Sequence, residues 1–228
     1  MKYDVVYIMK NDPDTDEIRY SLRSVERNFP YRKIWIFGGC PSGIVPDEFV
    51  PFEQCGRSKW EKATSTYRKI CETDGVTDDF WMFNDDFFVM QKVNVLPYMY
   101  SGTLEDKVNG ILEGARWSRY GKSLEMCLLE LTEKGFGSLN YALHVPMLFN
   151  KAKVLEVLDK IKSPMFRSLY GNYCRVGGID TDDVKINTLE GVPPDDCVLV
   201  STSDRAFERG ACGKLIRARF TEKCKFER

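Results

Sequence analysis

Apolar runs short enough to be strands alternate with stretches of helical periodicity through the first part of the chain. Residues 4–9 are an apolar, β-rich run, and a second run at 33–37 is closed by two glycines. Between these runs, apolar side chains recur at helical spacing, at Ile18, Leu22 and Val25. The pattern predicts a strand, a helix and a second strand, and such a β-α-β unit is expected to be parallel and right-handed.

The following residues predict a loop, a helix and a third strand. Prolines and glycines dominate residues 41–56, which are expected to form a surface loop. A helix is predicted over 58–71, where Ser58 stands three residues before Glu61, the spacing of a capping box. The bulky apolar run at 80–83 then predicts a strand that ends abruptly in polar residues.

The second half of the chain shows the same alternation less regularly. Residues 104–134 are rich in helix formers broken by glycines, 139–145 are strand-like, and 151–161 have the pattern of an amphipathic helix. A last short strand is predicted at 197–200. No repeat or linker divides the sequence, so we expect a single α/β domain over 1–228, with a mixed, mainly parallel sheet flanked by helices.

Composition is that of a globular, cytoplasmic protein. Hydrophobic residues make up 43% and charged residues 29% of the 228 positions, and no apolar run approaches the roughly 20 residues of a membrane-spanning helix. The first apolar stretch is too short for a signal peptide, so no membrane insertion is expected. The eight cysteines are widely spaced without a Cys-x-x-Cys pair, which favours reduced, buried thiols over disulfides.

Charge is balanced over the chain as a whole. The 33 basic and 34 acidic residues give a net charge of −1, which provides no overall field to attract nucleic acid. Residues 214–228 are locally basic. This segment is either a contact for a polyanionic acceptor or a solvated helix face.

The candidate chemistry lies in the polar residues after the strand at 80–83, namely Asn84, Asp85 and Asp86. Ligands of open α/β sheets bind outside the carboxyl ends of the strands. Adjacent carboxylates after a buried strand are costly unless they are solvated, paired or bound to a cation. Mg²⁺ and Mn²⁺ are typically held by one or two carboxylates and substrate phosphates, whereas many acidic turns simply cap backbone amides. Both interpretations are open from spacing alone.

Three segments resemble known families of sugar transferases. Residues 80–89, Phe-Trp-Met-Phe-Asn-Asp-Asp-Phe-Phe-Val, resemble the Asp-x-Asp region of nucleotide-diphospho-sugar transferases of the GT-A fold, and their Asn-Asp-Asp form is similar to the Stealth family of sugar-phosphate transferases. Residues 17–28 and 142–146 resemble other parts of these patterns. The resemblance implies a GT-A-like, Rossmann-like fold in which about 1–100 bind the nucleotide sugar and about 101–228 hold the acceptor site and the basic segment.

The resemblance also implies roles for individual residues. Because Asn84 replaces the first acidic residue of the Asp-x-Asp pattern, metal binding would depend chiefly on Asp86, with Asp85 directed towards the ribose or the ion. The cofactors implied are Mn²⁺ or Mg²⁺ and a nucleotide-sugar donor, with a UDP-sugar expected. GT-A enzymes bind the nucleotide at the carboxyl end of the first strand, which makes candidates of Met9, Lys10 and Asn11.

Cations and acid-base groups complete the candidate site. Arg19 and Lys62 could contact the diphosphate, or could be ordinary exposed helix cations. His144, the only histidine, could complete a metal site or act as an acid or base, or could be a satisfied core residue. After a pair of glycines, which allow close backbone approach, Asp182 and Asp183 could take a proton from an acceptor hydroxyl or could cap a helix.

The function implied is that of a metal-dependent glycosyltransferase, which moves a sugar from a nucleotide-diphosphate sugar to an acceptor hydroxyl. A Stealth-like transfer of sugar 1-phosphate is the alternative enzymatic function. A non-catalytic nucleotide- or glycan-binding module is the second alternative, motivated by Asn84. The acceptor could be a glycan, lipid-linked or not, a protein or, as in phage, a modified DNA base. Balanced charge argues mildly against DNA, whereas the basic segment at 214–228 argues mildly for it.

Overall fold

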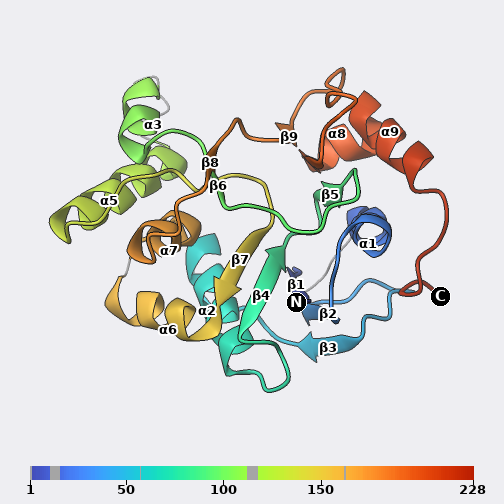
Figure 1. Ribbon diagram of the computed structural model, residues 1–228, viewed down its shortest axis with the longest axis horizontal. Coiled ribbons are helices and arrows are strands. Elements are labelled where there is room, and N and C mark those ends of the chain that lie inside the picture. Colours follow the sequence, from blue (N-terminus) through green and yellow to red (C-terminus); the bar gives the residue numbers. More distant parts are fainter. Residues whose placement is uncertain (1, 11–15, 57, 112–117, 162) are drawn as a thin grey trace.

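A central sheet organises the computed structural model, which describes residues 2–10, 16–56, 58–111, 118–161 and 163–228 (Figure 1). The sheet has five strands in the order β3-β2-β1-β4-β7, and all its neighbours are parallel except β4 and β7. Its strands are β1 (Asp4–Ile8), β2 (Ile34–Gly38), β3 (Glu48–Pro51), β4 (Asp79–Phe83) and β7 (Met147–Asn150). The fold is therefore mixed α/β with a mainly parallel sheet, as the sequence predicts.

Helices cover both faces of this sheet. Figure 1 shows α2 and α6 together on one side and α1 on the other. The helices are α1 (Glu17–Asn28), α2 (Lys59–Glu72), α3 (Leu104–Gly110), α5 (Arg119–Glu133), α6 (Lys151–Lys160), α7 (Phe166–Tyr173), α8 (Asp204–Arg209) and α9 (Ala211–Arg219). The predicted cap of α2 is present, because the Ser58 side chain accepts a hydrogen bond from the backbone of Glu61.

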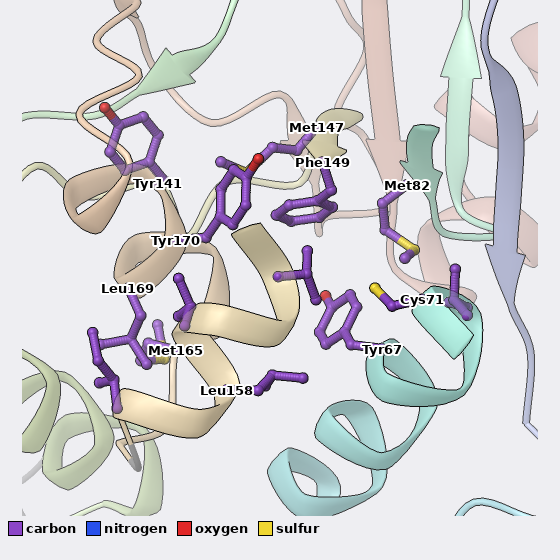
Figure 2. Close-up of a cluster of buried hydrophobic side chains, with 14 of the residues drawn as sticks. Tyr67, Cys71, Met82, Tyr141, Met147, Phe149, Leu158, Met165, Leu169 and Tyr170 are labelled. Atoms are coloured by element: carbon purple, nitrogen blue, oxygen red, sulfur yellow. The ribbon is translucent and has the colours of Figure 1, made fainter. Parts of the chain in front are cut away.

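Alternation along the strands sends side chains into two separate cores. In β1, Val6 packs with α2, α6 and α7, whereas Val5 and Tyr7 pack with α1. Figure 2 shows the first core, where Phe149 of β7 lies among aromatic side chains from α2 and α7. The ring centroids of Phe149 and Tyr170 lie 4.6 Å apart in an edge-to-face contact. Strands buried on both faces explain why their sequences are continuously apolar.

Small sheets continue the fold beyond β4. The strand β5 (Phe87–Val89) pairs antiparallel with β10 (Leu199–Thr202), which pairs in parallel with β9 (Lys185–Ile186). Further along, β6 (Met99–Tyr100) pairs in parallel with β8 (Ile179–Asp180). These pairings bring the 180–202 part of the chain back over the end of β4.

Two predicted elements differ from the structure. The loop predicted over 41–56 contains β3, which pairs with β2 at the edge of the sheet. The strand predicted over 139–145 is wrong, because β7 occupies Met147–Asn150 instead. Only the start of 139–145 pairs with another segment, in an isolated antiparallel bridge between Leu139 and Thr103. The next residues bond to side chains: Tyr141 N donates to Ser168 Oγ at 3.1 Å, and Ala142 N donates to Asn140 Oδ1 at 3.1 Å.

The basic segment at 214–228 is folded rather than free. Its first part lies in α9, and the chain then runs down beside α1 (Figure 1). Phe226 is buried, and Glu227 forms an ion pair with Arg23 of α1 at 2.6 Å. All eight cysteines are free thiols. Within the described residues, no helix has both the length and the apolar character needed to cross a bilayer.

Candidate functional site

The carboxyl ends of β1 and β4 meet at one edge of the sheet, since the two strands are parallel neighbours. Met9 follows β1 and is buried, and its carbonyl oxygen accepts a hydrogen bond from Gln54 Nε2 at 3.0 Å. Lys10 is exposed beside it, whereas the third candidate, Asn11, lies outside the described residues. Asn84 follows β4 and is exposed. The two predicted parts of a donor site therefore lie at the same edge.

Asp86 is buried, and one of its carboxylate oxygens is bound by the protein. Its Oδ2 accepts hydrogen bonds from Lys185 Nζ and from Ser201 Oγ, each at 2.9 Å. Lys185 belongs to β9 and Ser201 to β10, so the small sheet closes over this carboxylate. In the structure Asp86 links β4 to the second half of the chain.

Asp85 and Glu17 add two further carboxyl groups to this region. Burial, and then the charge of Asp86, raise the pKa of Asp85 to about 6. Burial raises the pKa of Glu17 to about 8, against the hydrogen bond that Thr202 Oγ1 donates to it at 2.9 Å, and the charges of Asp85 and Asp86 add to the rise. The end of β4 thus brings carboxyl groups together in a poorly solvated place, where protons are held more tightly than in water.

A cavity of about 490 Å³ opens beside Asn84 and brings four predicted residues together. It lies between α2, the end of β4, the chain around 140–144 and the start of α7. The four are Asn84, His144, Asp182 and Asp183. Its wall is aromatic on the α2, α5 and α7 sides, at Trp60, Tyr67, Tyr120 and Phe166.

His144 and Asp183 form a hydrogen-bonded pair in this cavity. Asp183 Oδ2 lies 2.7 Å from His144 Nδ1, and Asp183 Oδ1 accepts a hydrogen bond from the His144 backbone N–H at 3.0 Å. Burial alone would raise the pKa of Asp183, but the two hydrogen bonds from His144 outweigh it and lower the pKa below its usual value. Asp182 is exposed next to this pair.

Arg167 supports the same segment from α7. Its Nη1 donates to the carbonyl oxygen of Leu143 and its Nη2 to that of Val145, so the guanidinium holds the backbone on both sides of His144. Arg167 also lines the cavity. Burial lowers the pKa of Arg167, and the charges of Asp183 and Asp86 act against this fall.

The remaining candidates lie outside the cavity. Arg19 Nε donates to Asp16 Oδ1 at 3.0 Å, and Arg19 also bonds to the carbonyl oxygen of Ser42. Lys62 is exposed on α2. His144 is bound to Asp183, and no group of three His, Cys, Asp or Glu side chains in the described part of the chain could hold a metal ion.

Sequence reasoning missed Glu17, Arg167 and the aromatic wall. An acidic residue in the first turn of α1 is an ordinary helix signal, so nothing marked Glu17 as part of the site. The aromatic side chains come from α2, α5 and α7, whose spacing in sequence shows no motif. No sequence motif marked Arg167, which lies in the first turn of α7, as a residue of the site.

No protein-family model and no curated protein matches the sequence. Among solved structures, the galactosyltransferase LgtC in complex with donor and acceptor sugar analogues is 11% identical, with 97% of this chain and 98% of that chain covered and a TM-score of 0.45. An active-site mutant of LgtC is 12% identical, with 98% of this chain and 85% of that chain covered and a TM-score of 0.41. The glycosyltransferase GlyE of Streptococcus pneumoniae TIGR4 is 15% identical, with 58% of this chain and 39% of that chain covered and a TM-score of 0.30. Similarity this distant carries no argument about function, which rests on the residues of this chain.

Proposed function

We propose that the chain is a glycosyltransferase that moves a sugar from a nucleotide-diphosphate sugar to an acceptor hydroxyl. One observation carries the proposal: the cavity at the carboxyl edge of the sheet joins Asn84 to the His144–Asp183 pair and to Asp182. These groups come from segments about 40 to 100 residues apart in sequence. A cavity with convergent polar groups at a strand end is where α/β proteins bind ligands.

The donor fits the edge where β1 and β4 end. Lys10 is exposed at this edge, and the carboxyl groups of Asp85 and Glu17 lie near the end of β4. Burial and then the charge of Asp86 raise the pKa of Asp85, and a divalent cation would favour the ionised form against both effects. When bound, Mg²⁺ or Mn²⁺ would neutralise charge on the departing diphosphate. Asp86 is a weaker ligand in this arrangement, because Lys185 already occupies its Oδ2.

The acceptor fits the aromatic wall of the cavity. Sugar rings present C–H faces that pack on aromatic side chains, and Trp60, Tyr67 and Phe166 supply such surfaces. Both oxygens of Asp183 are engaged by His144, so Asp182 is the carboxylate available to take a proton from the acceptor hydroxyl. His144 and Asp183 keep the chain beside Asp182 in a fixed place.

The first experiment is a thermal-shift screen of UDP-, GDP-, ADP- and CMP-sugars with and without Mn²⁺, because a ligand of the native state raises the apparent stability. A metal-dependent shift in the wild type that is lost in Asp85→Asn supports the proposal and identifies the nucleotide. Asp195→Asn, at an exposed position away from the cavity, is the matched control. No shift with any of these donors contradicts the proposed donor site.

Product analysis then separates the two kinds of transfer. Release of a nucleoside diphosphate supports glycosyl transfer, whereas release of a nucleoside monophosphate indicates transfer of sugar 1-phosphate. Binding of a nucleotide sugar without any turnover in the presence of glycan acceptors would indicate a binding module. Asn84 at the first position of the acidic motif is the reason for testing this last alternative.

A further inference from the structure

Arg167 places a positive charge in the wall of the cavity. The structure records no ion pair for its guanidinium among the described residues. Its two recorded hydrogen bonds go to neutral carbonyl oxygens, those of Leu143 and Val145. A guanidinium has five N–H donors, so three of them are left for another acceptor.

Such a charge is costly in this position. Removing a cation from water is unfavourable unless an anion or several hydrogen bonds replace the lost hydration. Asp183 and Asp86 act on Arg167 only through space, and Asp183 is bound by His144 while Asp86 is bound by Lys185. The acids around Arg167 are therefore committed to other partners.

Arg167 also belongs to the proposed site. It lines the same cavity as Asn84 at the end of β4 and as Asp182. The cations expected to bind phosphate lie elsewhere, since Arg19 is paired with Asp16 and Lys62 is exposed on α2 outside the cavity lining. Lys107 lines the cavity as well, but as an exposed residue of α3.

We propose that Arg167 makes this cavity an anion-binding site that takes a phosphate group of a bound substrate. A guanidinium matches two phosphate oxygens with parallel N–H donors, which an ammonium group does not. The phosphate belongs either to the diphosphate of a nucleotide sugar or to a phosphorylated sugar. The site as an anion-binding site stands on its own geometry, and its assignment to a donor rests on the proposed function.

Calorimetric titration of the full chain with inorganic pyrophosphate tests the proposal, with UDP and glucose 1-phosphate titrated in parallel. UDP carries the leaving group of a donor, whereas glucose 1-phosphate carries a phosphate joined to a sugar alone. Arg167→Lys keeps the positive charge but removes the pair of parallel N–H donors of the guanidinium. At least one of the three ligands is therefore expected to bind at least about tenfold more weakly. Arg68→Lys, at an arginine of α2 that pairs with Asp159 of α6 outside the cavity lining, is the matched control.

A second measurement uses the wild-type chain, because Arg167→Lys also loses a bond to the 143–145 backbone and could fail to fold. Phenylglyoxal reacts with guanidinium groups, and mass spectrometry of the digested chain gives the extent of reaction at each arginine. Pyrophosphate is expected to protect Arg167 and to leave the exposed Arg175 unchanged.

The outcomes separate this site from the proposed function. Equal binding of all three ligands by the wild type and Arg167→Lys, or equal phenylglyoxal reaction with and without pyrophosphate, overturns the anion site even if a nucleotide sugar is turned over. Arg167-dependent binding of any of the three supports it, even if no nucleotide sugar is consumed and the proposed transferase function fails. Weakened UDP binding assigns the phosphate to the donor, and weakened glucose 1-phosphate binding alone assigns it to a phosphorylated sugar.

Discussion

Two adjacent carboxylates have different surroundings in the cavity. Asp183 uses both oxygens on His144, and its lowered pKa keeps it ionised at neutral pH. Asp182 is exposed and faces the cavity. A general base needs an oxygen that reaches the substrate proton, so geometry favours Asp182 as the base and Asp183 as the residue that positions His144.

We therefore expect Asp182→Asn to lower the rate of transfer about a hundredfold or more, because general acid-base catalysis contributes roughly 10²- to 10⁴-fold. Asp183→Asn should lower the rate less and should also lower the thermal midpoint, since it loses a charged hydrogen bond. Initial rates at saturating donor, measured beside the exposed Asp196→Asn variant, give the comparison. A larger loss of transfer rate in Asp183→Asn than in Asp182→Asn would instead identify Asp183 as the base.

Glu17 is the second residue whose surroundings decide its behaviour. Its pKa is raised from 4.5 to about 8, first by burial and then by the charges of Asp85, Asp86 and Asp204, against the hydrogen bond from Thr202. A carboxyl whose folded pKa is raised contributes its full stability below the unfolded pKa. That contribution is lost as the pH rises from about 4.5 through about 8, because ionisation then favours the unfolded chain.

Glu17→Gln should therefore flatten the pH dependence of stability. Glutamine keeps an acceptor for the Thr202 hydroxyl and never ionises, so the variant should gain about 4 kcal/mol relative to the wild type between pH 5 and pH 8. Urea unfolding at the two pH values measures the difference, and Glu26→Gln, exposed on the same helix, is the control. Parallel wild-type and variant profiles would contradict the raised pKa.

At the scale of elements, the strand β8 leads directly to Asp182 and Asp183 in the cavity. It follows Gly177 and Gly178, which both have positive φ angles, of 63° and 130°. A Cβ on Gly178 would lie 2.3 Å from the carbonyl oxygen of Tyr98, whereas a Cβ on Gly177 would meet nothing within 4 Å. The close backbone approach expected from the glycine pair is thus present at Gly178.

Gly178→Ala should displace β8 from β6 and move Asp182, so both transfer and stability should fall. Gly177→Ala is the matched control, because it should cost only about 1–2 kcal/mol for the left-handed backbone. Thermal midpoints and transfer rates of the two variants measure the contrast. Equal losses would show that the contact with Tyr98 adds nothing to the cost of the backbone conformation.

Elements with strong periodicity were predictable, and elements fixed by distant side chains were not. The helix expected at 151–161 is α6, and the runs at 4–9 and 33–37 are β1 and β2, because burial on both faces leaves a clear apolar signal. The apolar pattern of 139–145 is similar, but Arg167 and Asp183 bond to the backbone at Leu143 and His144, and only Leu139 forms a β-bridge. No local pattern reports on such partners.

For the whole molecule, the candidate site was likewise predictable only where a local sequence pattern marks its residues. Asn84, His144, Asp182 and Asp183 could be proposed from short motifs, and the structure brings them to one cavity. Arg167 and Glu17 belong to the site through contacts with residues far away in sequence, and single-sequence patterns do not contain those contacts. The proposal of a metal at Asp86 likewise could not foresee that Lys185 would bind the carboxylate.

The last residues of the sequence tie the two halves of the molecule together. Glu227 accepts hydrogen bonds from Arg23 Nε at 2.6 Å and Arg23 Nη2 at 2.7 Å, and its side chain is 1% exposed. Phe226 is buried in the core that contains α1 and β1. The segment therefore connects the helix α9 with the face of the sheet that α1 covers.

Glu227→Ala should destabilise the whole domain rather than a local tail. The substitution leaves the Arg23 guanidinium largely buried without its carboxylate, a change that costs about 3 kcal/mol in typical buried pairs. Urea unfolding followed by both far-ultraviolet circular dichroism and tryptophan fluorescence should show one transition moved to lower urea, because Phe226 belongs to the common core. Glu222→Ala, exposed in the same segment, should stay within about 0.5 kcal/mol of the wild type. Unchanged unfolding of Glu227→Ala would show that the segment is an appendage, and its basic residues would then be free to serve a polyanionic acceptor after all.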